Sequence, residues 1–238
     1  MIDVGGTHVK VLATGYRQPI KIDSGPRMTP PAMVAAVRDA TAGWTYDVVS
    51  IGFPGPVRKG RPAREPWNLG TGWVGFDFRR AFKRPVRLIN DAAMQALGSY
   101  AGGSMLFLGL GTGLGSSMIR GGDLIPLELA HLPFKHGESY EDCLGVAALE
   151  ALGKRVWRRN VAEVTALFLA ALQVDYVVLG GGNARHVKKL PKNARLGSNA
   201  NAFKGGYRLW DAGRAAPDGR SGQRSSSTPR SSSAAFRT

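Results

Sequence analysis

Residues 1–10 read MIDVGGTHVK, and this stretch decides the fold. A strand-like apolar start passes through Asp3 into Gly5-Gly6-Thr7, and a second apolar run follows from Val9. Glycines permit a tight turn and let backbone N–H groups approach a ligand closely, which is what a phosphate requires. The carboxylate of Asp3 is suited to hold a metal ion through water. Taken alone, the stretch favours an ordinary β-hairpin turn, because Gly-Gly is common there.

Length and composition place the chain among globular proteins. Its 238 residues can build one large domain or two small ones, and an apolar content of 43% predicts a real core. No apolar run approaches the ~20 residues that span a bilayer, and the first residues do not have the pattern of a signal peptide, so we expect no membrane partner. Cys143 is the only cysteine. It excludes an intramolecular disulfide and a multi-cysteine metal site, and it fits a reducing, cytoplasmic setting.

The formal net charge of +15 indicates an anionic partner: nucleic acid, a membrane surface or a phosphorylated substrate. From Ala212 to Thr238 the sequence holds five arginines and one aspartate, which leaves about +11 on the preceding residues. We predict that residues 211–238 are a disordered, low-complexity basic tail without a function of its own. The other charges include the pairs Lys154-Arg155, Arg158-Arg159 and Lys188-Lys189.

Hydrophobic periodicity predicts a β-β-β-α-β order for the first quarter of the chain. Thr29 is the expected N-cap of the helix, since prolines follow it in the first turn. The expected strands lie within residues 2–14, on both sides of the glycine turn, and within 19–24 and 46–57. Residues 58–85 are predicted to form loops with one short helix near 76–82.

The second part of the chain repeats the first pattern. Residues 104–125, SMLFLGLGTGLGSSMIRGGDLI, predict another hairpin with a glycine turn, so we expect an internal duplication. A strand is expected to run into a helix at Asn90-Asp91, before this hairpin. The further expected elements are a helix from 145 to 173, a buried strand in VDYVVLGGGNA at 174–184, and one short element in ANAFKGGYRLW at 200–210.

Three glycine turns, with Asn-Asp between the first two, resemble the ROK family (repressor, open reading frame, kinase). The order of motifs is most similar to that of its polyphosphate glucokinases, and the resemblance covers about residues 1–210. It implies an α/β fold of the actin-like, hexokinase-type ATPases, related to ribonuclease H, with a cleft between two lobes. We place the small lobe at residues 1–90 and the large lobe at 91–210, and we expect them to close on sugar.

The same resemblance implies a phosphotransferase of the glucokinase type that acts in carbohydrate metabolism and glycolysis. It would transfer a phosphoryl group from polyphosphate and/or ATP to the 6-hydroxyl of a hexose, with glucose as the first candidate and Mg²⁺ as the cofactor. We also predict a homodimer. The alternatives are a kinase for mannose, fructose or an N-acetylated amino sugar, and a catalytically impaired sugar-sensing relative.

The resemblance assigns the donor side of the cleft. The first and second turns would face each other and hold the phosphates, Asp3 would position Mg²⁺ through water, and LGGGNA would lie near adenosine. The implied phosphate- or nucleotide-binding residues are Asp3, Gly5, Gly6, Thr7, Lys10, Gly111, Thr112, Gly113, Gly181, Gly182 and Asn183. The alternative for LGGGNA is a turn between two elements that binds no ligand.

Asp91 is the predicted catalytic base. A sugar hydroxyl must lose a proton as it attacks phosphorus, so a carboxylate has to lie within hydrogen-bond reach. Asp91 at a strand-to-helix junction would be fixed by a rigid element, and the amide of Asn90 can both donate to and accept from sugar hydroxyls. The alternative is that Asp91 is only the N-cap of its helix.

Further sugar-binding residues are implied by resemblance. In LELAHLPF, Glu128 and His131 are three residues apart, which would place them on one face of a helical turn. Glu141 in YEDCLG and Asn68 in WNLGTGWVGFDF complete the predicted set. The alternatives are a structural histidine at 131 and a solvated helix start at 141.

The sequence departs from the family in three places. Many ROK proteins hold zinc just after the Glu-x-x-His element, but this region has a single cysteine, Cys143, and zinc needs about four ligands, so we expect no zinc site. ROK repressors carry an N-terminal helix-turn-helix, for which there is no room before Gly5, so we expect no specific nucleic-acid partner. The abrupt start and the short C-terminal end put full activity in doubt.

Overall fold

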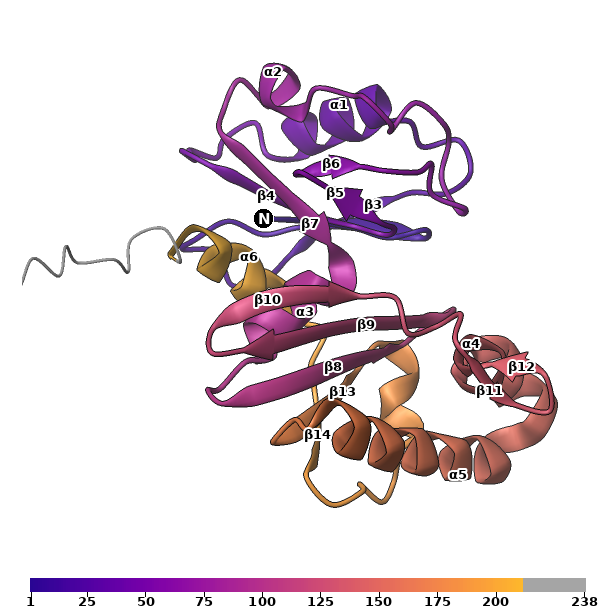
Figure 1. The fold of residues 1–238 in the computed structure, drawn as a ribbon. Helices are drawn as coiled ribbons and strands as arrows, with labels where there is room; N and C mark the ends of the chain where they lie inside the picture. The colour runs from indigo at the N-terminus through magenta and orange to yellow at the C-terminus, as the bar shows by residue number, and fades with distance from the viewer. Residues whose placement is uncertain (212–238) are drawn as a thin grey trace, which may run out of the picture.

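The computed structural model describes residues 1–211, so the predicted basic tail lies outside the described residues except for Asp211. Two five-stranded sheets form two lobes, with α3 (Asp91–Ser99) and α6 (Asn201–Asp211) between them (Figure 1). None of the helices in this part of the chain is both long and apolar enough to cross a membrane.

The first sheet has the strand order β3-β2-β1-β4-β7. Its first three strands are antiparallel, and β4 and β7 then add in parallel to β1. Every residue of β4 is buried, as expected for a strand that is covered on both faces. The strands are β1 Ile2–Val4, β2 His8–Val11, β3 Ile20–Asp23, β4 Val49–Phe53 and β7 Val86–Asn90.

Helix α1 (Pro30–Ala40) lies between β3 and β4 in the chain, which confirms the predicted β-β-β-α-β order. Thr29 is its N-cap residue and prolines occupy its first turn, as expected. The predicted short helix is α2 (Phe78–Phe82). A small hairpin of β5 (Val57–Arg58) and β6 (Arg61–Pro62) occurs where only loops were expected.

The second sheet has the order β10-β9-β8-β13-β14, which is the same connectivity as the first: three antiparallel strands followed by two parallel ones. The predicted second hairpin is therefore confirmed, and the shared order supports an internal duplication. Strand β10 was not expected from the sequence. The strands are β8 Ser104–Leu110, β9 Leu114–Arg120, β10 Asp123–Leu127, β13 Tyr176–Gly180 and β14 Ala194–Leu196.

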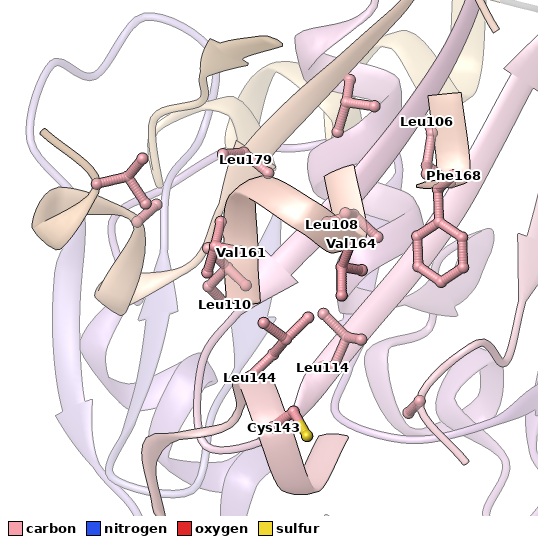
Figure 2. Packing of buried hydrophobic residues seen from close by; sticks show 14 of the residues in the cluster. Leu106, Leu108, Leu110, Leu114, Cys143, Leu144, Val161, Val164, Phe168 and Leu179 are labelled. Atoms are coloured by element: carbon pink, nitrogen blue, oxygen red, sulfur yellow. The ribbon is translucent and has the colours of Figure 1, made fainter. Parts of the chain in front are cut away.

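Helix α5 (Val146–Leu172) confirms the helix predicted for residues 145–173, although Gly153, with φ of 70°, interrupts it. Its buried face, with Val161, Val164 and Phe168, packs against the leucines of β8 (Figure 2). The shorter elements of this lobe are β11 Pro133–Lys135, β12 Glu138–Ser139, α4 Tyr140–Leu144 and the 3₁₀ helix η1 Gly182–His186.

The last described helix, α6, connects α3 with the first sheet. Arg208 donates to the backbone oxygens of Leu97 and Tyr100 at the C-terminal end of α3. Trp210 Nε1 donates to Ser50 Oγ on β4, at 2.9 Å. An element from the end of the described chain therefore supports the first lobe, while the boundary between residues 90 and 91 stays a prediction.

Candidate active site

The two glycine turns line one cleft of about 620 Å³ between the lobes. Gly5 and Gly6 come from the β1–β2 turn, and Gly111 to Gly113 come from the β8–β9 turn. Asp91 and Gln95 of α3 line the same cleft. The cleft thus brings together backbone N–H donors from two lobes and one carboxylate.

The first turn is held by a neighbouring strand and by a distant loop. Ser24, which follows β3, donates its Oγ to the backbone oxygen of Gly5 at 2.6 Å and its N–H to the backbone oxygen of Thr7 at 3.0 Å. Asn68 packs over the turn, because a Cβ atom added to Gly6 would lie 2.8 Å from Asn68 Cβ. Glycine at position 6 is therefore what permits Asn68 to approach the turn so closely.

The second turn is held by side chains of its own lobe. Glu141 Oε2 accepts from the backbone N–H of Leu114 at 3.0 Å, and a Cβ atom on Gly113 would overlap that carboxylate. Asn183 Nδ2 donates to the backbone oxygen of Gly111 at 3.0 Å. Glu141 and Asn183, which the sequence assigned to sugar and nucleotide, both brace this turn.

Asn90, not Asp91, is the N-cap of α3, so the alternative reading of Asp91 as a cap is wrong. Asn90 Oδ1 accepts from the N–H of Ala93 and its Nδ2 donates to the backbone oxygen of Gly55, both at 3.1 Å. The Asp91 side chain accepts from the N–H of Ala92 at 2.8 Å and borders the cleft. The oxygen and the nitrogen of the Asn90 amide therefore each have a protein partner. A contact between Asn90 and the sugar stays a prediction.

The electrostatics around Asp91 favour proton exchange near neutral pH. Burial raises the pKa of Asp91 to about 7, and the negative charge of Asp3 adds to this shift. Burial also raises the pKa of Asp3, although Lys10 Nζ, 3.8 Å from Asp3 Oδ2, opposes it. Asp3 and Asp91 are neighbours across β4, because a Cβ atom on Gly52 would lie 3.7 Å from both Asp3 Oδ1 and Asp91 Cα.

Gln95 is a candidate residue that the sequence analysis missed. It lies one helical turn after Asp91 and lines the same cleft. Its Oε1 is buried and has no hydrogen-bond partner within residues 1–211. A buried unpaired acceptor costs about 1–3 kcal/mol, which a bound water or hydroxyl would relieve. The i, i+4 spacing from Asp91 is the sequence signal that points to it.

Glu128 and His131 do not lie on a helical turn, which corrects the sequence prediction. They follow β10 in a loop where the N–H of Leu132 donates to the oxygen of Leu129. The Oγ of Ser116 on β9 accepts from the N–H of Leu129 at 3.2 Å and so keeps the chain alongside the sheet.

Glu128 and His131 nevertheless share a cavity of about 550 Å³ next to the cleft. Its opposite side is formed by residues 54–56 and 63–67 of the first lobe. Pro54, Pro66 and Trp67 line both cavities and so form their common wall. The two spaces are therefore adjacent, and both lie between the lobes.

The predicted site residues divide into two groups. Those that line the cleft are Gly5, Gly6, Asn68, Asp91, Gly111, Thr112, Gly113, Glu141 and Gly181. Those that do not line it are Asp3, Thr7, Lys10, Asn90, Glu128, His131, Gly182 and Asn183. The roles of both groups stay predictions.

The acidic residues around β1 and α3 fit Mg²⁺ better than a soft metal. Oxygen atoms are the ligands that Mg²⁺ prefers, and the neighbouring carboxylates of Asp3 and Asp91 offer them. Cys143 is buried, its Sγ donates to Glu138 Oε2 at 3.3 Å, and burial raises its pKa to about 11. In the part of the chain that the structure describes, no three His, Cys, Asp or Glu residues gather to hold a metal ion.

Comparisons with known proteins identify the family to which the chain is similar. The model of the ROK family matches residues 1–126. Polyphosphate glucokinase of Mycobacterium leprae is 28% identical over 206 residues, which cover 77% of this chain and 63% of that protein. Polyphosphate glucokinase of Mycobacterium tuberculosis is 28% identical over 209 residues, which cover 79% and 78%. The chain thus spans slightly less than two thirds of the first relative.

The fold is shared with solved structures. The inorganic polyphosphate/ATP-glucomannokinase from Arthrobacter sp. strain KM superposes with a TM-score of 0.71 and 25% identity, over 89% of this chain and 97% of that one. The predicted two-lobed, actin-like fold of the hexokinase type is therefore confirmed.

Proposed function

Because the chain belongs to the ROK family, we propose that it is a sugar kinase that phosphorylates the 6-hydroxyl of a hexose. One observation carries the proposal: both glycine turns and Asp91 line a single cleft. The names of the mycobacterial and Arthrobacter relatives add support, since these relatives are kinases of glucose or of glucose and mannose. Glucose is therefore the first substrate to test.

The chemistry is a phosphoryl transfer with Asp91 as the base. The oxygen of the 6-hydroxyl forms a bond to the terminal phosphorus of the donor, and the bond from that phosphorus to the bridging oxygen breaks. Asp91 accepts the hydroxyl proton, for which a pKa of about 7 is suited. The N–H groups of Gly5, Gly6 and Gly111 to Gly113 hold the phosphate oxygens, so catalysis rests on positioning and on charge stabilisation.

Asp3 is the residue that would hold Mg²⁺, through water. When present, Mg²⁺ would neutralise the charge of the donor phosphates. Lys10 pairs with Asp3 in the neighbouring strand and limits the negative charge at this position. We expect activity to depend on added Mg²⁺.

Polyphosphate is the proposed donor, with ATP also usable through the loop at Gly181 to Asn183. Basic residues gather around η1, which follows Gly181 in the chain: desolvation and the positive charges of Lys154, Arg185 and Arg158 lower the pKa of His186. Such a cluster suits a long polyanion that extends beyond the active site. We further propose that the chain forms a homodimer.

A coupled kinase assay tests the function. Glucose, mannose, fructose and N-acetylated amino sugars are each offered with Mg²⁺ and either ATP or polyphosphate. We expect turnover with glucose and both donors. Hexose binding without turnover with any donor would contradict the kinase and support an impaired sugar-sensing relative.

The salt dependence of turnover and a variant that removes two positive charges test which phosphoryl donor the chain uses. Polyphosphate use should weaken steeply with salt, because each neutralised phosphate releases counterions, whereas ATP use should change far less. The double variant Lys154→Gln/Arg185→Gln should raise the KM for polyphosphate and leave that for ATP nearly unchanged, and Arg38→Gln on α1 is the matched control. Equal salt sensitivity of the two donors would remove polyphosphate from the proposal.

A further inference from the structure

Trp67 stands out because its side chain is 100% exposed. The other tryptophans are better covered: Trp73 and Trp157 are fully buried, and Trp44 and Trp210 are half-buried. A tryptophan that contacts a partner covers roughly 150–250 Å² of surface, so this indole offers a large unused apolar face.

The backbone around Trp67 is held in place although its side chain is free. The carboxylate of Glu65 accepts from the N–H groups of Trp73 and Val74, both at 3.0 Å. Gly70 N–H donates to the oxygen of Met28 at 3.0 Å. The indole is therefore presented by a fixed loop.

Trp67 lines both cavities. It lies in their common wall, with the Asp91 cleft on one side and the cavity of Glu128 and His131 on the other. Gly181, which belongs to the predicted adenosine loop, lines only the first of these spaces. The cavity of Glu128 and His131 contains none of the predicted donor-binding residues, so a ligand that contacts Trp67 and extends into this cavity lies away from the adenosine loop.

We propose that the indole of Trp67 is the platform on which the C–H face of the hexose packs. The inference rests on the proposed function. A pyranose has an apolar face of C–H groups and an edge of hydroxyls, which matches an aromatic side chain beside a few polar groups. With the ring on Trp67, Glu128 and His131 can bond hydroxyls on one side while the 6-hydroxyl is directed to Asp91 on the other. When the lobes approach, Trp67 becomes covered.

Tryptophan fluorescence with acrylamide as quencher tests this contact in the full chain. Trp67 is the most accessible tryptophan of the described residues, so glucose should reduce the quenched fraction in the wild type. In Trp67→Phe, glucose should no longer reduce the fraction of fluorescence that acrylamide quenches. Trp44→Phe is the matched control, because Trp44 stacks on Tyr16 with ring centroids 4.2 Å apart and lines neither cavity. The control should keep the glucose effect.

Kinetics and calorimetry give the second readout. Trp67→Ala should raise the KM and the Kd for glucose about 10- to 100-fold, while kcat and the KM for the donor change little. Trp67→Phe should recover most of the loss because the aromatic face remains. A purely structural role would instead lower the melting temperature, and Phe would not restore sugar affinity selectively.

The outcomes separate this inference from the proposed function. If glucose binds but no donor supports turnover, the kinase proposal fails while shielding of Trp67 still supports the platform. If glucose is phosphorylated without shielding Trp67, and Trp67→Ala binds it normally, the platform alone is wrong. If no hexose of the panel binds by calorimetry, both are wrong.

Discussion

The two glycine turns occupy equivalent places in sheets of equal connectivity, yet they are supported differently. The β8–β9 turn joins two strands of 7 residues, whereas β1 and β2 have only 3 and 4. Glu141 and Asn183 bond directly to the second turn. The first turn depends on Ser24 and on Asn68, its neighbour in the loop of Trp67.

Each turn therefore contacts a different part of the molecule. The second turn is joined to the end of β13 through Asn183, on the side predicted for adenosine. The first turn touches the loop that carries Trp67, on the side proposed for the sugar. A substitution that disturbs the Trp67 loop should therefore affect the first turn more than the second.

The largest expected effect is that of Asp91→Asn, which removes the group between the two turns. Turnover should fall by about 10²–10⁴, the range for a lost general base, with folding and sugar affinity kept. Near-normal kcat in steady-state kinetics would contradict the assignment of Asp91 as base.

Gly113→Ala should break the second turn. The added Cβ overlaps the Glu141 carboxylate, so we expect kcat/KM for the donor to fall about 10- to 100-fold and stability to drop by about 1–3 kcal/mol. Gly111→Ala is the matched control for stability, because its Cβ would meet nothing within 4 Å. Equal melting temperatures of the two variants would show that Glu141 does not pack tightly against the turn.

The pH dependence of stability isolates Asp91 from both turns. Its pKa of about 7 exceeds the ordinary value of 3.8, so between these pH values the folded chain keeps a proton that the unfolded chain has released. Stability therefore falls as the pH rises across this range. The Asp91→Asn variant has no carboxyl group at this position, so its free energy of unfolding should not fall in this way. At pH 8 it should be more stable than the wild type by on the order of 1–2 kcal/mol, a range that allows for the partial exposure of the Asp91 side chain to solvent. Urea unfolding should give no difference near pH 3.

Ser24→Ala should loosen only the first turn. Loss of its bond to Gly5 should cost about 0.5–1.5 kcal/mol and raise the donor KM a few-fold. Ser198→Ala, which removes a comparable bond at the start of α6, is the control. If Ser198→Ala raises the KM for the donor as much as Ser24→Ala does, the bond from Ser24 to the first turn has no particular role in donor binding.

Local patterns in the sequence predicted the hairpins and the Asn90-Asp91 junction. Each depends on a strand, a glycine turn and a strand, or on a strand next to a helix. The N-cap role of Asn90 could also have been predicted from the sequence, because asparagine is a preferred N-cap residue and the helix starts one residue later.

Features that depend on tertiary contacts were not predictable in this way. Strand β10 forms because β9 offers a free edge, and its extension keeps Glu128 and His131 out of a helix. The bracing of the second turn joins Leu114 to Glu141, which are 27 residues apart in the chain. The unpaired oxygen of Gln95 is recognisable only once its burial is known.

The central claim is that the two turns form one phosphate site around Asp91. A crystal structure of the chain with glucose, Mg²⁺ and a non-hydrolysable donor analogue tests it most directly. We predict that the donor phosphates accept hydrogen bonds from N–H groups at both Gly5-Gly6 and Gly111–Gly113, with the sugar 6-hydroxyl within reach of Asp91. Phosphates bound to only one turn, or a sugar remote from Asp91, would contradict the account.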